Sequence, residues 1–230
     1  MTNTVPEEVT DRAKNNAAPS DSKLLGLGLK TWWLLLIRPI EDYLIDKKIH
    51  PNVLTVSSLI VSMISGLFFY FGLIFLAGLL MLSGSTFDIF DGRVARAQNL
   101  SSEAGAFFDS CLDRIAEAFI YLGLLGYFQG TVFIYVVLLI VSSTMMVSYA
   151  KARAEGLGAK CDVGIMQRTE RVVYLGLFSV FNFIGNLITD AFKLEGRDYL
   201  LKFALIVMLI FSVYTVIQRM AATMKELNER

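Results

Sequence analysis

Long apolar stretches alternate with short polar ones along most of the chain, and this pattern predicts membrane helices. No Asp, Glu, Lys or Arg lies between His50 and Asp88, or between Glu117 and Lys151. As a single helix, either run would be roughly 50 Å long, well beyond a hydrocarbon core of about 30 Å. Each run is therefore expected to fold as a hairpin, with turns near Gly72 and near residues 126–130.

Six membrane-spanning helices follow from the same pattern, over residues 53–71, 74–97, 103–126, 131–155, 167–188 and 196–221. The predicted fold class is an all-α, polytopic membrane protein whose six-helix domain covers residues 51–230. Residues 1–22 are polar and predict a disordered tail. Residues 23–50 are amphipathic and contain paired tryptophans, which favour the headgroup level, so we expect an interfacial helix there. A short buried helix is the alternative.

Composition and charge narrow the class further. The chain is 55% hydrophobic and 18% charged, with a mean hydropathy of +0.56, which argues against a disordered protein or an ordinary soluble domain. Its 21 basic and 21 acidic residues cancel, so no overall field would attract nucleic acid. The two cysteines, Cys111 and Cys161, are expected to be small buried apolar residues rather than a disulfide or a metal site.

The basic residues predict the orientation in the membrane. The connections between the second and third and between the fourth and fifth spans are rich in Lys and Arg, whereas the opposite loops hold only Lys193 and Arg197. Because basic loops stay on the cytoplasmic side, we expect a multi-pass protein of the cell membrane with both termini in the cytoplasm.

Four aspartates at the cytoplasmic ends of two neighbouring helices predict a metal site. Asp88 and Asp91 lie three residues apart on one helix, and Asp109 and Asp113 lie four apart on the next, so each pair shares a helix face. Four carboxylates in a partly dehydrated site repel one another unless cations neutralise them. An all-oxygen site suits Mg²⁺ or Mn²⁺, and two such ions are common in phosphoryl transfer.

Other interpretations of these charges remain open at this point. The aspartates could instead be solvated helix-end acids that pair with nearby arginines. Glu117, one turn beyond Asp113, could support the site, but pairing with Arg114 or with a basic residue of another helix is the favoured interpretation. His50 beside Pro51 is expected to have a structural or surface role rather than one in proton transfer.

The spacing D-x2-D-G-x2-A-R-x8-G-x3-D-x3-D over residues 88–113 resembles the signature of the CDP-alcohol phosphotransferase family. The resemblance implies a homodimer of six-helix subunits with a cytoplasmic active site. In that site an acceptor hydroxyl attacks the β-phosphate of a CDP-linked lipid, and CMP leaves. It makes Asp88, Asp91, Asp109 and Asp113 the ligands of two metal ions, with Asp113 also the catalytic base. The implied contacts with the CDP-lipid are Asn52, Val53, Leu54, Thr55, Gly92, Arg96 and Ser102.

Two further segments are similar to one branch of that family. S-Y-x-K-A-R-A-E-G at residues 148–156 and G-x-x-x-R-x-E-R at residues 164–171 resemble the branch that makes phosphatidylinositol phosphate or its archaeal ether-lipid counterpart. The similarity implies CDP-diacylglycerol or CDP-archaeol as the donor and inositol 1-phosphate as the acceptor. It assigns the acceptor phosphate to Lys151, Arg153, Arg168 and Arg171.

One departure from that branch keeps other acceptors open. Its members commonly show E-R-P-E-R, where this chain has Q-R-T-E-R at residues 167–171. Glycerol 3-phosphate, free inositol and serine are the alternative acceptors within the family. Outside the family, a cation-binding transporter is the remaining alternative.

Overall fold

The computed structural model describes residues 27–193 and 195–229, and every regular element in them is a helix. This confirms the predicted all-α fold class. The elements are α2 (Leu27–Asp46), α3 (Pro51–Tyr70), α4 (Ile74–Ala97), α5 (Glu103–Tyr127), α6 (Phe133–Gly156), α7 (Arg168–Ala191) and α8 (Tyr199–Asn228). The predicted tail at residues 1–22 lies outside the described residues.

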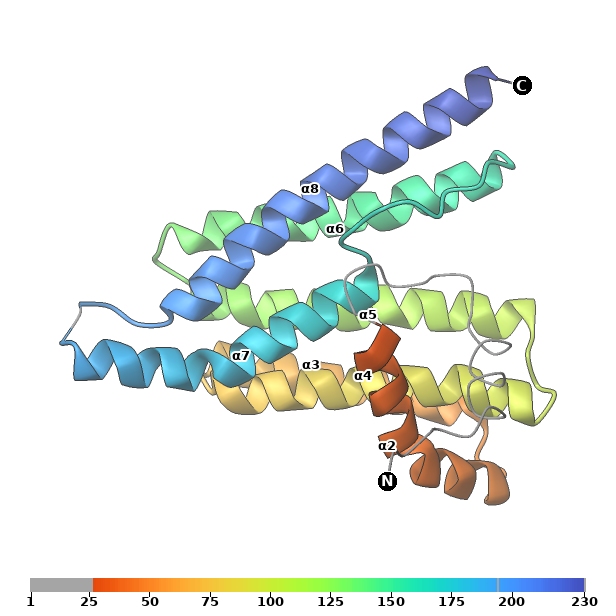
Figure 1. Cartoon of the computed structure of the whole chain (residues 1–230), viewed down its shortest axis with the longest axis horizontal. Coiled ribbons are helices and arrows are strands. Elements are labelled where there is room, and N and C mark those ends of the chain that lie inside the picture. The colour runs from red at the N-terminus through yellow and green to blue at the C-terminus, as the bar shows by residue number, and fades with distance from the viewer. Residues whose placement is uncertain (1–26, 194, 230) are drawn as a thin grey trace, which may run out of the picture.

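Helices α3 to α8 run roughly along one direction, and α7 joins the two parts of the bundle (Figure 1). Helix α3 packs against α4 and α5 to form one part, and α6 packs against α8 to form the other. Helix α7 contacts both α4 and α8. The first turn of α7 therefore lies where it can meet side chains from the first part of the bundle.

Five of the described helices are long and apolar enough to cross a membrane: α3, α4, α6, α7 and α8. Helix α5 is also long, at 25 residues, and packs beside α3. It carries several charged residues, among them Asp109, Asp113 and Glu117. Its charges explain why composition alone does not identify it as a span. The fold is that of a polytopic membrane protein, and the count of six spans stays a prediction.

The predicted helix boundaries agree with the observed ones to within a few residues at most ends. Both predicted turns are present, with Gly72 (φ +73°) and Gly130 (φ +79°) in the left-handed conformation that glycine adopts readily. Helix α8 is the exception, because it continues seven residues beyond the predicted end at 221. The α6–α7 connection supports this extension, since the Lys160 N–H donates to Glu226 Oε2 at 3.0 Å.

The backbones of α3 and α5 approach each other closely at two glycines. A Cβ atom on Gly66 would collide with the carbonyl of Phe119, and one on Gly123 would collide with the carbonyl of Gly66. Only glycine permits this approach. The close packing holds α5, which carries two of the four candidate aspartates, against the hairpin that carries the other two.

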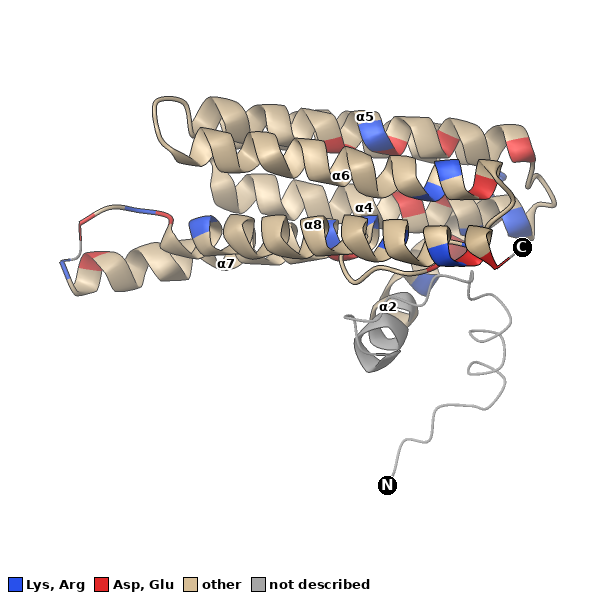
Figure 2. Cartoon of the chain, turned by 90° about the horizontal axis from the view of Figure 1, so that it is seen from above, with Lys and Arg blue, Asp and Glu red and all other residues tan. Residues whose placement is uncertain are grey.

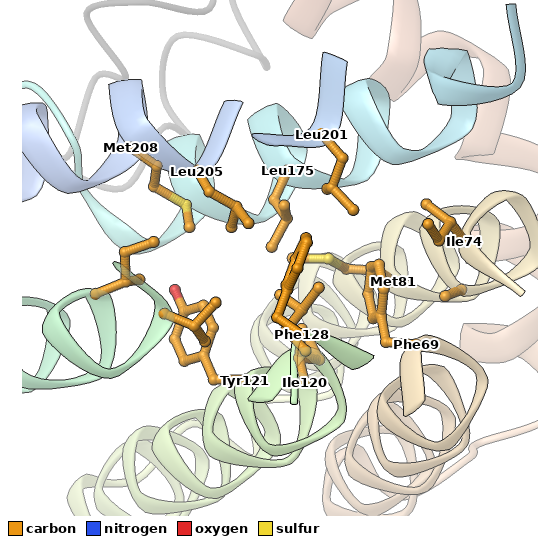
Figure 3. Packing of buried hydrophobic residues seen from close by; sticks show 14 of the residues in the cluster. Phe69, Ile74, Met81, Ile120, Tyr121, Phe128, Leu175, Leu201, Leu205 and Met208 are labelled. Carbon is orange, nitrogen blue, oxygen red and sulfur yellow. The ribbon is translucent and has the colours of Figure 1, made fainter. Parts of the chain in front are cut away.

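A buried apolar cluster fills the middle of the bundle and joins α5, α7 and α8 to the α3–α4 hairpin (Figure 3). Leu175 of α7 and Leu201 and Leu205 of α8 are fully buried there, as is Phe69 of α3. Because lipid tails are as apolar as these side chains, close packing rather than removal from water stabilises the cluster. This cluster holds the helices of the bundle together.

Helix α2 runs across the direction of the other helices (Figure 1). Its Ile37 is buried in a cluster with Leu54 and Val94, and its Glu41 forms an ion pair of 2.7 Å with Arg93 of α4. The helix ends at Asp46, within the predicted segment 23–50. Its placement at the membrane interface stays a prediction.

The two cysteines differ from each other. Cys161 is buried, as predicted, and packs with Ala154 and Ala159. The prediction for Cys111 is wrong, because this residue is exposed. It lies on α5 between Asp109 and Asp113, and helical periodicity alone did not identify this exposed position.

Candidate active site

Charged side chains gather toward the end of the bundle where α4, α6 and α8 finish and α5 and α7 begin (Figure 2). We call this the charged end. The other end, where α7 leads into α8, is the opposite end. All four candidate aspartates belong to α4 and α5 and lie toward the charged end.

On α4, Asp91 is buried and Asp88 is partly buried. The Thr55 hydroxyl of α3 donates a hydrogen bond of 2.7 Å to Asp91 Oδ2, so α3 orients this carboxylate. Thr55 is itself one of the predicted CDP-lipid contacts. In the structure its hydroxyl also lies 3.2 Å from the Pro51 carbonyl, which fixes it at the start of α3.

On α5, Asp109 and Asp113 face the α4 aspartates. Asp88 and Asp109 lie within electrostatic reach of Asp91, and Asp88 and Asp109 within that of Asp113. Asp109 Oδ1 is buried and has no hydrogen-bond partner among the described residues. A buried carboxylate oxygen without a donor is costly, so this atom calls for a cation or a ligand.

Arg168, the first residue of α7, bridges the two helices that carry the aspartates. Its Nη2 atom lies 2.7 Å from Asp88 Oδ2 and 2.8 Å from Asp113 Oδ1. The structure therefore brings one of the predicted phosphate ligands into direct contact with two of the predicted metal ligands. A positive charge occupies the space between the two carboxylates.

The donor set fits hard divalent cations. The four carboxylates supply only oxygen atoms, and the buried, unpartnered Asp109 Oδ1 leaves an acceptor open. Within the described part of the chain, no group of three or more Asp, Glu, His or Cys side chains is already drawn together around one point.

The predicted CDP-lipid contacts divide into exposed and buried residues. Asn52 and Val53 are exposed, whereas Leu54 is 4% exposed and packs with Phe90. His50 caps α3, because its Nδ1 accepts from the Asn52 N–H at 3.2 Å. The predicted structural role of His50 is confirmed.

The remaining predicted CDP-lipid contacts lie near the aspartates along the chain. Gly92 follows Asp91, and a Cβ atom there would meet only the end of the Arg96 side chain, at 3.5 Å. Arg96 is exposed in the last turn of α4. Ser102 caps α5, since its hydroxyl accepts from the Gly105 N–H at 3.0 Å. These ligand contacts stay predictions.

The predicted phosphate ligands differ in how freely they can meet an anion. Arg153 is exposed, and the structure records no ion pair for it among the described residues. Lys151 lies 3.6 Å from Asp162 and 3.7 Å from Glu155. Both side chains belong to the last turns of α6, at the charged end, where an incoming polar molecule would arrive.

Arg171 has a different environment. Its side chain is 1% exposed, and it binds Glu117 through both carboxylate oxygens, with Nε–Oε1 at 2.7 Å and Nη2–Oε2 at 3.0 Å. Its Nη1 donates to the Met166 carbonyl, and Tyr121 donates to Glu117 Oε1 at 2.9 Å. Of the two partners expected for Glu117, Arg114 or a basic residue of another helix, the structure shows the second, Arg171 of α7. The phosphate contact of Arg171 stays a prediction.

Arg219 of α8 was not singled out as a site residue from the sequence. It is 4% exposed, and it donates to the carbonyls of Val163 and Val147 at 2.9 and 2.6 Å. No ion pair to a carboxylate is recorded for it within the described ranges. A lone arginine 17 residues after Lys202 in an apolar helix was the available signal, since such residues mark functional positions in membrane proteins.

The chain is similar in sequence to a known protein family and to several of its members. The CDP-alcohol phosphatidyltransferase family profile matches residues 48–224. The archaetidylinositol phosphate synthase of Methanothermobacter thermautotrophicus is 30% identical over 187 residues, which is 80% of this chain and 89% of the relative. The phosphatidylinositol phosphate synthase of Streptomyces avermitilis is 30% identical over 220 residues, which is 93% of this chain and 88% of the relative.

Solved structures agree with these sequence matches. The phosphatidylinositol phosphate synthase of Mycobacterium tuberculosis with CDP-DAG bound has a TM-score of 0.68 and 25% identity, and the match covers 80% of this chain and 92% of that one. The structure of the same enzyme with manganese and citrate also gives 0.68, with 25% identity, covering 80% and 87%. The predicted family and transferase class are confirmed, and the transporter alternative is excluded. The chain belongs to the CDP-alcohol phosphatidyltransferase family.

Proposed function

We propose that this protein transfers a phosphatidyl or archaetidyl group from a CDP-lipid to inositol 1-phosphate and releases CMP. The observation that carries the proposal is that one end of the bundle combines four aspartates with several basic side chains. The carboxylates suit the metal ions of phosphoryl transfer, and the basic groups suit an acceptor that carries its own phosphate. The relatives named for inositol phosphate lipids support this choice of acceptor.

Asp88, Asp91, Asp109 and Asp113 would hold two Mg²⁺ or Mn²⁺ ions. When bound, these ions supply positive charge that stabilises the phosphate oxygens and the leaving CMP. Thr55 holds Asp91 in place by its hydrogen bond, so that the carboxylate needs little rearrangement when a cation arrives. The manganese in the Mycobacterium tuberculosis structure supports this assignment.

In the transfer step, the acceptor hydroxyl oxygen forms a bond to the β-phosphorus of the CDP-lipid. The bond from that phosphorus to the CMP oxygen breaks, and CMP leaves with the electron pair. Asp113, at the α5 side of the site, accepts the proton of the acceptor hydroxyl. The nucleotide would be held by exposed residues at the start of α3 and by Gly92, Arg96 and Ser102.

The acceptor phosphate would be held by Arg153 and Lys151 from α6 and by Arg168 from α7. The predicted nucleotide contacts come instead from α3, α4 and the start of α5, so donor and acceptor would be held by different helices. The ion pair between Arg171 and Glu117 fixes the first turn of α7 against α5, and thereby the position of Arg168 one turn earlier. We further propose that the charged end faces the cytoplasm, with both termini, and that the enzyme works as a homodimer.

The direct test is CMP release by the purified enzyme with CDP-diacylglycerol or CDP-archaeol, offered a set of acceptors in the presence of Mn²⁺. We expect release with inositol 1-phosphate and little with free inositol, glycerol 3-phosphate or serine. Equal release with free inositol would refute the phosphorylated acceptor. The family and the metal site would then still stand. Comparing the two donors also distinguishes ester from ether lipid.

A further inference from the structure

Arg168 occupies a position that a metal ion would also need. A single nitrogen of its guanidinium, Nη2, lies within 2.8 Å of carboxylate oxygens from both Asp88 and Asp113. A divalent cation shared by these carboxylates would lie about 2.0–2.6 Å from each oxygen. The guanidinium and such an ion cannot occupy the same space between the two oxygens.

We propose that Arg168 is an internal cation that holds Asp88 and Asp113 in the metal-free enzyme and moves aside when divalent ions bind. Metal loading thereby frees the Arg168 guanidinium to bind the acceptor phosphate. This second step rests on the proposed function, whereas the exchange of arginine for metal does not. The enzyme would thus complete its acceptor pocket only after its metal site is filled.

The way Arg168 is held supports this movement. Its side chain is 26% exposed, its two ion pairs use the same terminal nitrogen, and its Nε has no hydrogen-bond partner among the described residues. A rotation of the outer torsions would release both contacts together. The backbone need not move, because Arg171, one turn later on α7, is fixed by its bidentate pair with Glu117.

Arg168 and Arg171 differ in how costly it is to release them from their carboxylates. Arg171 binds one carboxylate with two parallel bonds and is 1% exposed, so release would leave Glu117 as an uncompensated buried charge. Arg168 contacts carboxylates that gain other cations when metal binds, so its release leaves neither carboxylate unpaired. Only Arg168 can therefore exchange at low cost.

Charge balance gives the exchange its direction. Four carboxylates with one guanidinium carry a net charge of minus three, and the repulsion among them favours any further cation. Two divalent ions bring four positive charges, which balance the four carboxylates without the arginine. The displaced guanidinium then needs another anion, and an acceptor phosphate at the same end of the bundle supplies one. Binding of metal and acceptor should consequently strengthen each other.

Isothermal titration of the detergent-purified, EDTA-treated enzyme with MnCl₂, with neither substrate present, tests the exchange. We expect Arg168→Gln to bind Mn²⁺ roughly tenfold more tightly than the parent protein, because the metal no longer displaces a charge-assisted pair. Unchanged or weaker Mn²⁺ binding in this variant would overturn the proposal.

Arg114→Gln is the matched control. Arg114 follows Asp113 on the same helix and undergoes the same loss of charge, but its recorded hydrogen bond goes to the Ser110 carbonyl at 2.7 Å. Its charge acts on Asp109 and Asp113 only through space, so we expect a much smaller gain in Mn²⁺ affinity than in Arg168→Gln. An equal gain in both variants would show that net charge, rather than occupation of the site, controls metal binding, and would overturn the exchange.

A second variant tests the exchange if Arg168→Gln fails to fold. A second binding measurement tests the coupling between Mn²⁺ and the acceptor. Arg168→Lys keeps a positive charge but loses the planar fork, so we expect a smaller gain in Mn²⁺ affinity than in Arg168→Gln. If Arg168→Lys shows no gain in Mn²⁺ affinity, that result contradicts the exchange. In the parent protein, Mn²⁺ should strengthen binding of inositol 1-phosphate, and this coupling should vanish in Arg168→Gln. If inositol 1-phosphate does not bind at all, the proposed function fails, while the MnCl₂ titration still decides the exchange.

Discussion

Buried carboxylates have different partners at the two ends of the bundle. At the opposite end, Asp198 is 5% exposed and accepts hydrogen bonds from Asn182 at 2.6 Å, from Asn186 at 2.9 Å and from Tyr127. At the charged end, Asp109 Oδ1 is buried with no donor among the described residues, and Asp88 and Asp113 share one guanidinium. Both ends contain acids, but only one end leaves them in need of cations.

Asp198 shows what a structural carboxylate looks like in this fold. It precedes α8 in a left-handed conformation (φ +61°), and its N–H donates to Asn186 Oδ1 at 2.9 Å. Burial alone would raise its pKa, but the hydrogen bonds from Tyr127, Asn186 and Asn182 hold the pKa below its usual value. Neutral donors therefore satisfy this charge, and it ties α5 and α7 to the start of α8.

The largest expected effect tests the charged end. Asp109→Asn should abolish metal-dependent CMP release while leaving a folded protein, because it removes a charged ligand from a site that needs every carboxylate. The measurement is CMP release in detergent with saturating Mn²⁺, together with the size-exclusion profile of each protein. Asp198→Asn is the control, since it makes the same change at the opposite end and should retain turnover at low temperature.

Substantial metal-dependent turnover in Asp109→Asn would refute the two-metal site. Equal loss of turnover in both variants, with both proteins folded, would remove the distinction between the two ends.

The next effect concerns the buried ion pair between Glu117 and Arg171. Glu117→Gln should lower stability by about 3–5 kcal/mol, because it leaves the Arg171 guanidinium buried without a counter-charge. Thermal unfolding in detergent measures the loss. Removing both charges in Glu117→Gln with Arg171→Met should recover part of the stability but not the activity, since Arg168 loses its fixed base. A double variant as unstable as the single one would show that the pair does not act as a unit.

A smaller effect is expected for the exposed basic residue on α6. Arg153→Gln should weaken the apparent affinity for inositol 1-phosphate roughly tenfold, through loss of one charge-assisted hydrogen bond, and should leave that for the CDP-lipid nearly unchanged. Two saturation curves measure this, one for each substrate. Equal changes in both curves, or none, would remove Arg153 from the acceptor pocket.

The smallest effect concerns the pH dependence of the opposite end. Because the folded pKa of Asp198 lies below its ordinary value, its ionised form stabilises the fold above that ordinary value. This contribution is lost as the pH falls through the lowered pKa. Asp198→Asn should therefore lower the unfolding temperature near pH 7 and flatten its decline in acid. A parent and variant that decline alike between about pH 5 and pH 3 would contradict this role.

The hydrophobic pattern was sufficient to predict the fold because most of the helices are long and apolar, with glycine in the two hairpin turns. Charge limited what composition alone could identify, since α5 carries five charged residues and fails a simple hydropathy test. Helical spacing also predicted that Asp109 and Asp113 share a face. This prediction depended only on local geometry, which the sequence specifies well.

The division of labour among the arginines could not be predicted. Arg168 and Arg171 lie three residues apart and share roughly one face of α7, so spacing alone suggested a shared anion. The rotation of α7 against α4 and α5 decides which arginine meets Asp88 and which meets Glu117. That rotation is a property of tertiary packing, and so is the burial of Arg219 under the α6–α7 connection.

The most direct test of the contrast between the two ends is the anomalous X-ray signal of Mn²⁺ in crystals of the parent protein. We predict manganese peaks among Asp88, Asp91, Asp109 and Asp113, and none beside Asp198, whose oxygens already accept hydrogen bonds from neutral donors. Absence of manganese from the four aspartates, or an equal peak at Asp198, would contradict the account.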